Sequence, residues 1–337
     1  MLALGVLDQS AIVTGGTPVQ AMAQTIELAK LTERLGYYRF WLSEHHAADG
    51  LAGSSPEVLM AAVGAHTSRI RIGSAGILLS HYSPYKVAEN VRVLEALYPG
   101  RIDVGIGRSA GGGTPVSEAL RRGPAEDAES FAGKVWQLIG YLGDIGEQGW
   151  GTARLKAAPF VTTAPDPWLL GSGHYSAELA ASLGAAFSYA HFIKGSAGLG
   201  AAGLYADRFR PGPLGTRPRI NLCVNVVCAD TEEEAERLAF PVALRMLLIE
   251  RGQFGRTYLT MEEAAAYRLT EEDMAAVQAH RHNRMIAGDP EQVKRQLIQL
   301  SGDAQANELI VLTMLHDFEA RKRSYELLAE AFFHTNG

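Results

Sequence analysis

The chain has 337 residues, of which 47% are hydrophobic, so it is long enough to bury a large core. Its formal net charge is −6, from 31 basic and 37 acidic residues with no basic tract, which disfavours a nucleic-acid or anionic-membrane partner. No stretch of about 18 uncharged apolar residues occurs, so we expect no membrane-spanning helix.

The first seven residues are apolar but lack the basic residues that open a signal peptide, and Asp8 follows at once. We interpret them as a first strand. The two cysteines, Cys223 and Cys228, lie at an odd spacing within one expected strand, so their side chains point to opposite faces and no disulfide is expected between them. Two buried thiols indicate a reducing, cytoplasmic compartment.

Short runs rich in Ile, Val and Leu alternate along the chain with longer runs at helical spacing. The expected strands are 2–7, 38–42, 70–78, 102–107, 168–171, 186–190, 220–228 and 308–313. The helices expected after them are 18–35, 56–66, 85–97, 116–142, 176–183, 199–209, 232–249 and 318–332. This alternation predicts an α/β fold, with a parallel sheet covered by helices. Eight units favour a single (β/α)8 TIM barrel over residues 1–337, with an open doubly wound sheet as the alternative.

Two segments of the chain are additional to the eight strand–helix units of a minimal barrel. Residues 144–167 are rich in Gly, Ala and Pro and show no clear period. Residues 250–288 form a long insertion between the seventh and eighth units, in which "TMEEAAAY" and "TEEDMAAVQAH" both begin with Thr and acidic residues, as helices do. We predict a helical insertion near the barrel mouth, followed by a helix from Pro290 that leads into the last strand.

Glycine and polar residues collect where the expected strands end, and the strand bodies contain almost none. In such a barrel the carboxyl ends of the strands form the working face. The second strand runs into Glu44, His45 and His46. Strand neighbours point to opposite faces, and no HxH pair or HExxH helix occurs, so a metal site is not expected. One imidazole suits proton transfer, with the other and Glu44 as supports, but purely structural histidines also fit the pattern.

Two neighbouring strand ends carry residues that suit a phosphate. The fifth strand runs into "GSG" and a helix opens behind it, which indicates either an anion site or an ordinary helix cap. Arg108 follows the fourth strand and faces a glycine-rich loop, where it can bind a phosphate or form an ion pair. Together they favour one phosphate site, formed by Arg108, Gly171, Ser172, Gly173 and Ser176.

The third strand ends in "SAGILL" (74–79), whose small residues leave room for a flat ring or reflect ordinary barrel packing. With these stretches in this order, the chain resembles the bacterial luciferase-like monooxygenase family over about 1–230 and 289–333. The resemblance is carried by "RFWLSEHHAADGLAGSSPEVLMAA", "RIRIGSAGILLSHYSPYKVAENVRVLEALYPGRIDVGIGR", "PWLLGSGHYSAELAASLG" and "RSYELLAEAF".

The resemblance implies a homodimeric barrel that binds FMN, supplied reduced by a separate reductase. Reduced flavin reacts with O2 to give a C4a-peroxyflavin, which oxygenates a small organic substrate. By motif position, His45 corresponds to the family's active-site histidine, and Arg108 to its phosphate-binding arginine. Ser172, Gly173 and Ser176 correspond to the phosphate loop. Ala75 and Gly76 correspond to a non-prolyl cis peptide beneath the flavin ring.

The sequence departs from the family pattern in three places. The loop after Arg108 reads "SAGGG", His174 lies within the phosphate loop, and Gly107 replaces the reactive cysteine of the light-emitting subunit, so light emission is not expected. Two alternatives to the monooxygenase stay open: a deazaflavin-dependent reductase or dehydrogenase, and a non-enzymatic flavin-binding protein. An apolar substrate is expected, because few basic residues remain at the mouth once Arg108 binds phosphate.

Overall fold

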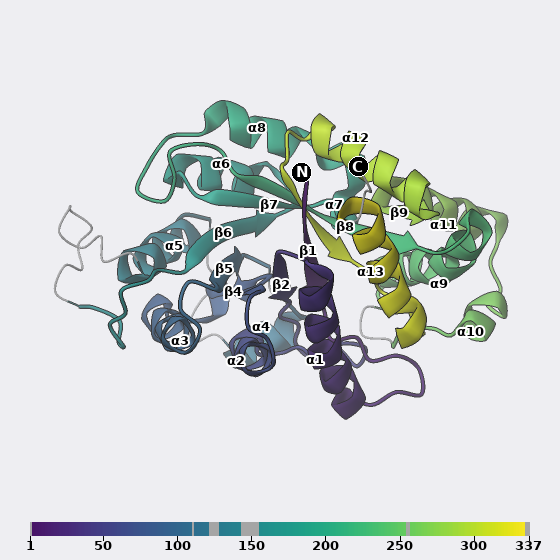
Figure 1. Ribbon diagram of the computed structural model, residues 1–337, viewed down its shortest axis with the longest axis horizontal. Helices are drawn as coiled ribbons and strands as arrows, with labels where there is room; N and C mark the ends of the chain where they lie inside the picture. Colours follow the sequence, from purple (N-terminus) through teal and green to yellow (C-terminus); the bar gives the residue numbers. More distant parts are fainter. Residues whose placement is uncertain (1, 110, 121–127, 143–154, 254–256, 334–337) are drawn as a thin grey trace.

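The chain forms a closed barrel of parallel strands surrounded by helices, as the (β/α)8 prediction requires (Figure 1). This computed structural model describes residues 2–109, 111–120, 128–142, 155–253 and 257–333. Neighbouring barrel strands pair in chain order, and the last strand pairs with both the first and the seventh, so the ring closes. The eight barrel strands are β1 (Ala3–Asp8), β2 (Arg39–Leu42), β3 (Arg71–Ser74), β5 (Ile102–Gly107), β6 (Asp166–Gly171), β7 (Ala186–Ala190), β8 (Ile220–Cys228) and β10 (Glu308–Leu312).

Helix ends follow local sequence signals. Thr17 caps the first helix: its hydroxyl accepts from the Gln20 N–H, and the Gln20 side chain accepts from the Thr17 N–H. Gly36 ends that helix with φ of 92°, a conformation that glycine adopts without steric cost. The helices are α1 (Pro18–Leu35), α2 (Pro56–His66), α3 (Pro84–Leu97), α4 (Thr114–Leu120), α5 (Ala128–Leu142), α6 (His174–Leu183), α7 (His191–Lys194), α8 (Gly200–Arg208), α9 (Glu232–Glu250), α10 (Met261–Ala265), α11 (Glu271–Arg284), α12 (Pro290–Asp303) and α13 (Phe318–Phe333).

Side chains alternate between the two faces of the barrel wall, and the cysteines illustrate this on β8. Cys223 packs inside the barrel in one cluster with Trp41 and Trp168, whereas Cys228 belongs to the layer between the strands and helices. Both thiols are buried and free, which confirms that they form no disulfide with each other. Burial raises the pKa of Cys228 to about 12, so that thiol is not a reactive thiolate at neutral pH.

The end of the barrel opposite the mouth is filled by a buried ionic cluster. The Arg39 guanidinium lies 2.6 Å from Asp103 and 2.5 Å from Glu308, and Arg71 bonds the other oxygen of Asp103. The Trp41 indole N–H also donates to Asp103, at 2.8 Å. The expectation that strand bodies hold almost no polar residues is therefore wrong. Polar side chains occur there because they satisfy one another within the barrel.

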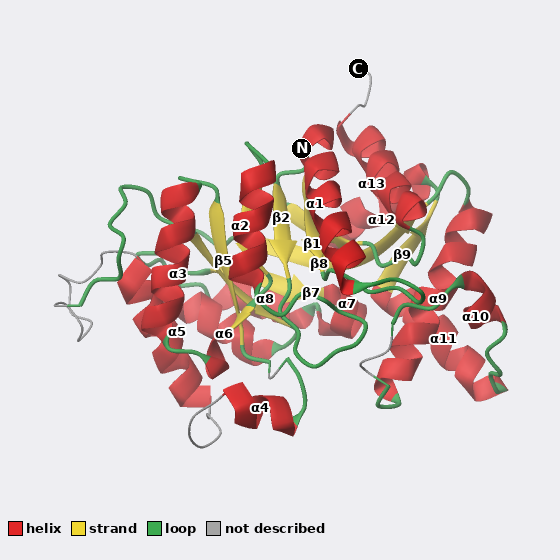
Figure 2. Cartoon of the chain, turned by 90° about the horizontal axis from the view of Figure 1, so that it is seen from below, coloured by secondary structure: helices red, strands yellow, loops and turns green. Residues whose placement is uncertain are grey.

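Within its described residues, the insertion contains the two helices that the sequence predicts, joined by non-helical loops, and it ends in a strand. These helices, α10 and α11, lie beside α9 on one side of the barrel (Figure 2). Residues expected to continue this helical segment instead form strand β9 (Met285–Gly288), which pairs with residues 225–228 of β8. This strand forms because β8 extends beyond the end of its pairing with β10 at Asn225, which leaves an edge for β9 to occupy.

Two other elements differ from the sequence prediction. The expected third strand is divided at Ala75–Gly76 into β3 and the short β4 (Ile77–Leu78). The single helix expected over 116–142 is present as α4 and α5, and residues 121–127 between them lie outside the described part of the chain. Across the described residues, every helix is too short or too polar to cross a bilayer.

Candidate active site

The Glu-His-His stretch lies in the loop that follows β2, because the strand ends at Leu42. Strand alternation therefore does not by itself orient the two histidines. Their hydrogen bonds do: His45 Nδ1 lies 3.1 Å from the Ser43 hydroxyl, and His46 Nε2 lies 2.7 Å from a Glu44 oxygen. Each imidazole has its own partner. Among the described residues, no group of three or more His, Cys, Asp or Glu side chains is arranged to hold a metal.

Glu44 is a buried carboxylate that ties this loop to the next strand. It accepts from the Leu78 N–H at 2.9 Å, from the Tyr82 hydroxyl at 2.6 Å, and from His46. Burial, together with the hydrogen bond to Glu44, raises the pKa of Tyr82, which keeps the phenol protonated as a donor. Glu44, His46 and Tyr82 thus form a satisfied network that fixes the wall of the mouth.

His45 has a different environment from His46. Burial lowers the pKa of His45 to about 4, and the charges of Arg245 and His46 act in the same direction. The imidazole is therefore neutral between pH 5 and pH 8, a range in which an unperturbed histidine titrates. Ser43 lies beside Nδ1 of this ring, and a neutral imidazole is a group that can take part in proton transfer.

The peptide bond between Ala75 and Gly76 is cis, as the family resemblance implied. The Ala75 N–H donates to the Leu42 carbonyl at 2.6 Å, which connects this segment to the end of β2. A Cβ on Gly76 would lie 2.9 Å from the Gly105 carbonyl oxygen, so the backbones of neighbouring strands are too close here for a larger residue. The cis peptide therefore packs closely against β5, with Gly76 buried and Ala75 partly buried.

The phosphate-type residues of the fourth and fifth barrel strands are brought together. The Arg108 guanidinium lies 4.4 Å from the centre of the Tyr175 ring, which stands in the first turn of α6. Gly173 begins this helix without a side-chain cap, and the N–H groups of a first helical turn are a favourable site for an anion. Ser176 packs so closely against Gly171 that only glycine fits there. His174 is exposed. This arrangement can hold a phosphate group.

Arg245 is a residue of this region that the sequence motifs did not reveal. It lies on α9, is only 6% exposed, and its guanidinium stacks 4.0 Å from the centre of the Tyr258 ring. Tyr258 in turn pairs with Val13, in the loop that follows β1 at the mouth. The sequence does contain one indication of this residue: an arginine within the apolar run "VALRMLLI" (242–249). Burying a charge there is unfavourable unless a partner or ligand compensates it.

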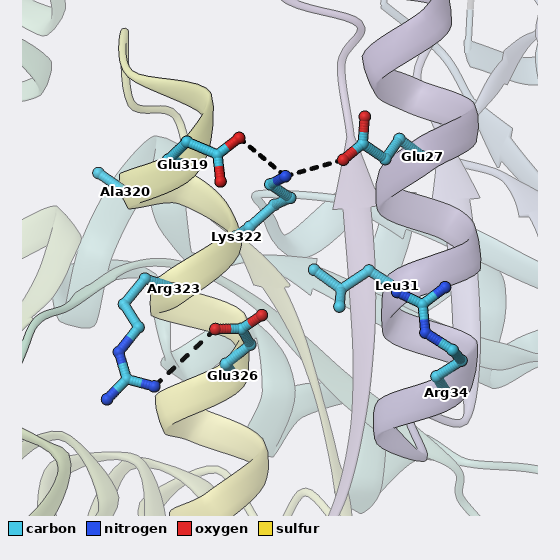
Figure 3. A pocket seen from close by; sticks show the side chains of 8 residues that line it. All are labelled: Glu27, Leu31, Arg34, Glu319, Ala320, Lys322, Arg323 and Glu326. Atoms are coloured by element: carbon cyan, nitrogen blue, oxygen red, sulfur yellow. Dashed lines mark hydrogen bonds and ion pairs between the residues drawn. The ribbon is translucent and has the colours of Figure 1, made fainter.

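A hollow lies outside the barrel, between α1 and α13 (Figure 3). Its walls carry charged side chains that neutralise one another: Lys322 lies 2.8 Å from both Glu27 and Glu319, and Arg323 pairs with Glu326. These are exposed ion pairs of the kind that contributes little to stability. The hollow has none of the features of the mouth, and we assign it no role in the chemistry.

Comparison with known proteins identifies the family of the chain. The model of the family described as luciferase-like monooxygenase matches residues 2–304. The chain belongs to the luciferase-like monooxygenase family. The N-acetyl-S-alkylcysteine monooxygenase of Bacillus subtilis (strain 168) is 35% identical, over 98% of this chain and 98% of its own length. The crystal structure of apo-MsnO8 is 40% identical and covers 100% of this chain and 99% of its own, with a TM-score of 0.90.

More distant luciferase-like structures share the fold alone. The oxygenating constituent of 3,6-diketocamphane monooxygenase from Pseudomonas putida, in complex with FMN, is 19% identical with a TM-score of 0.72. An F420-dependent secondary alcohol dehydrogenase is 17% identical with a TM-score of 0.67. These chains cover 98% of the present one, and it covers 97% and 98% of theirs. The barrel thus occurs in proteins that use different flavin-type cofactors.

Proposed function

We propose that this member of the family is an FMN-dependent monooxygenase, which uses reduced FMN and O2 to oxygenate a small organic substrate. The observation that carries the proposal is the arrangement of the mouth. In the strand order, the cis peptide at Ala75–Gly76 lies between the loop of His45 and the anion-type site of Arg108 and α6. A planar ring with a phosphate tail matches that arrangement.

The residues present fit FMN at both ends. For the phosphate, they provide the Arg108 guanidinium, the N–H groups that open α6, and the Ser172 and Ser176 hydroxyls. For the ring, we assign the cis peptide of Ala75 and Gly76, whose small residues leave room for a planar group. When bound in its reduced form, FMN supplies the electrons that activate O2, and the protein orients it and excludes water.

His45 is the proposed proton-transfer residue. Its neutral imidazole can take up a proton at the mouth, while Ser43 holds its Nδ1 side. Glu44 and His46 act as positioning residues, because their hydrogen bonds join the loop to β4 and to Tyr82. In this proposal none of the three binds a metal.

The proposal also covers the source of reduced FMN, the oligomeric state, the cellular location and the size of the substrate. We infer that a separate reductase supplies reduced FMN, that the enzyme is a homodimer, and that it acts in the cytoplasm. The Bacillus subtilis relative is named for N-acetyl-S-alkylcysteine, and we propose a substrate of comparable size here. Size-exclusion chromatography with light scattering tests the dimer, and a mass equal to one chain would contradict it.

The experiment for the proposed function is rapid mixing of the protein with reduced FMN and then with O2, followed at the flavin absorption bands. We expect a long-lived species whose spectrum differs from those of reduced and oxidised FMN. Reoxidation at the rate of free flavin would contradict the monooxygenase and favour a protein that only binds flavin. A parallel titration with reduced F420 separates the other alternative, since tight binding of F420 with none of FMN would indicate a deazaflavin enzyme.

A further inference from the structure

Arg245 carries a buried positive charge that the described part of the chain does not neutralise. The residue is 6% exposed, and its Nε and Nη1 atoms are buried without a hydrogen-bond partner. No carboxylate in the described residues pairs with its guanidinium; the ring of Tyr258 is its aromatic neighbour. A buried charge without a partner is costly, so such a group is retained where it has a ligand.

Other buried arginines of the barrel show what a structural role looks like. Arg39 is 3% exposed and bonds two carboxylates, those of Asp103 and Glu308. Arg321 is 4% exposed and lies 2.9 Å from Asp8. Each of these charges is compensated within the protein. Arg245 has the same burial and lacks the compensation, which separates it from the arginines that hold the scaffold together.

The contacts of Arg245 place it near the candidate active site. The Tyr258 ring on which its guanidinium stacks belongs to a residue that pairs with Val13, in the loop after β1. The charge of Arg245 also contributes to the environment of His45. In the strand ring, Arg245 lies beside the loop after β1, whereas Arg108 follows β5, which is separated from β1 by β2 and β3. The two cations therefore occupy different sides of one mouth.

We propose that Arg245 binds the acidic group of the substrate, so that the substrate is a small organic acid with an apolar remainder. A carboxylate or sulfonate can accept hydrogen bonds from the unpaired guanidinium N–H groups, and the surrounding Leu and Tyr side chains accommodate the apolar part. This proposal rests on the proposed function for its site. It replaces the sequence-based expectation of an apolar substrate, which rested on the few basic residues that remain at the mouth once Arg108 binds phosphate.

The test is calorimetric titration of the FMN-loaded protein with hexanoate, hexanesulfonate and the uncharged hexanamide. We expect the two acids to bind at least about 10-fold more tightly than the amide, as hydrogen bonds to a charged group allow. Arg245→Met should abolish this preference and leave hexanamide binding unchanged, while Arg245→Lys should retain part of it. Arg237→Met is the matched control, because Arg237 lies on the same helix but is exposed and paired with Glu234.

Several results would overturn the proposal: equal binding of acid and amide to the unmodified protein, binding of neither acid, or acid binding that survives Arg245→Met. FMN and riboflavin titrations provide a second readout. We expect Arg245→Met to leave both affinities unchanged, and a selective loss of FMN would reassign Arg245 to the phosphate. Because these measurements need no turnover, acid binding through Arg245 without any oxygenation would contradict the proposed function alone.

Discussion

An arginine is buried at each end of the barrel, and comparing the two distinguishes a structural role from a ligand-binding role. At the closed end, Arg39 is held by Asp103 and Glu308 and stacks on Trp168 at 4.8 Å. At the mouth, Arg245 stacks on Tyr258 at 4.0 Å but has no carboxylate among the described residues. Residue type and burial are the same at both ends. The two arginines differ in whether a carboxylate pairs with the guanidinium. We therefore assign the paired arginine to the stability of the fold and the unpaired one to ligand binding.

The largest expected effect on stability is at the closed end. Arg39→Met leaves Glu308 without its buried partner and should lower the free energy of unfolding by about 3–5 kcal/mol. Arg245→Met removes a charge that has no partner and should not lower it. Urea denaturation of both variants measures the contrast. Equal loss of stability in the two variants would contradict this distinction, because it would mean that both arginines are structural.

His45→Ala should reduce the rate of substrate oxygenation by about 100-fold or more, the usual contribution of a positioned acid–base group. FMN affinity should not change, because His45 is assigned to proton transfer and not to cofactor binding. Single-turnover kinetics with reduced FMN measure the rate. His66→Ala, an exposed histidine near the end of α2, is the control and should behave as the unmodified protein. Unchanged turnover in His45→Ala would return the histidine to a structural role.

Arg108→Ala should weaken FMN by about 10-fold to 100-fold, the range for hydrogen bonds to a charged group. Riboflavin has no phosphate, so its affinity should change little. Fluorescence titration of both flavins gives the ratio directly. Equal losses for FMN and riboflavin would show that Arg108 acts through Tyr175 and the local fold, not through the phosphate.

A further expected effect is a dependence of stability on pH that arises from buried neutral histidines. Burial lowers the pKa values of His45 and His191 from 6.5 to about 4. Between these pH values the unfolded chain binds protons that the folded chain does not, so stability should fall as the pH drops from 6.5 toward 4. The fall should be shallower in His45→Gln. An identical slope in that variant would contradict the assigned pKa of His45.

Periodicity was sufficient to predict the barrel, because each strand must present apolar residues to the helices around it. It could not predict β9, since Met285–Gly288 becomes a strand through the free edge of β8, a feature of tertiary structure. Motifs indicated Arg108, His45 and the loop of Ser172 as candidates because each lies just after an expected strand. The motifs did not indicate Arg245, because it lies within a helix and far along the chain from the loop after β1. That it lacks a carboxylate partner among the described residues can be seen only from the three-dimensional structure.

The most direct test of the central claim is oxygen transfer itself. The protein, a flavin reductase and FMN are supplied with isotope-labelled O2 and a panel of small thioethers, aldehydes, terpenes and organic acids, and products are analysed by mass spectrometry. We predict that one labelled oxygen atom enters a product, that an organic acid is the preferred substrate, and that His45→Ala suppresses the product. Consumption of reduced flavin with every panel compound unchanged would contradict the account.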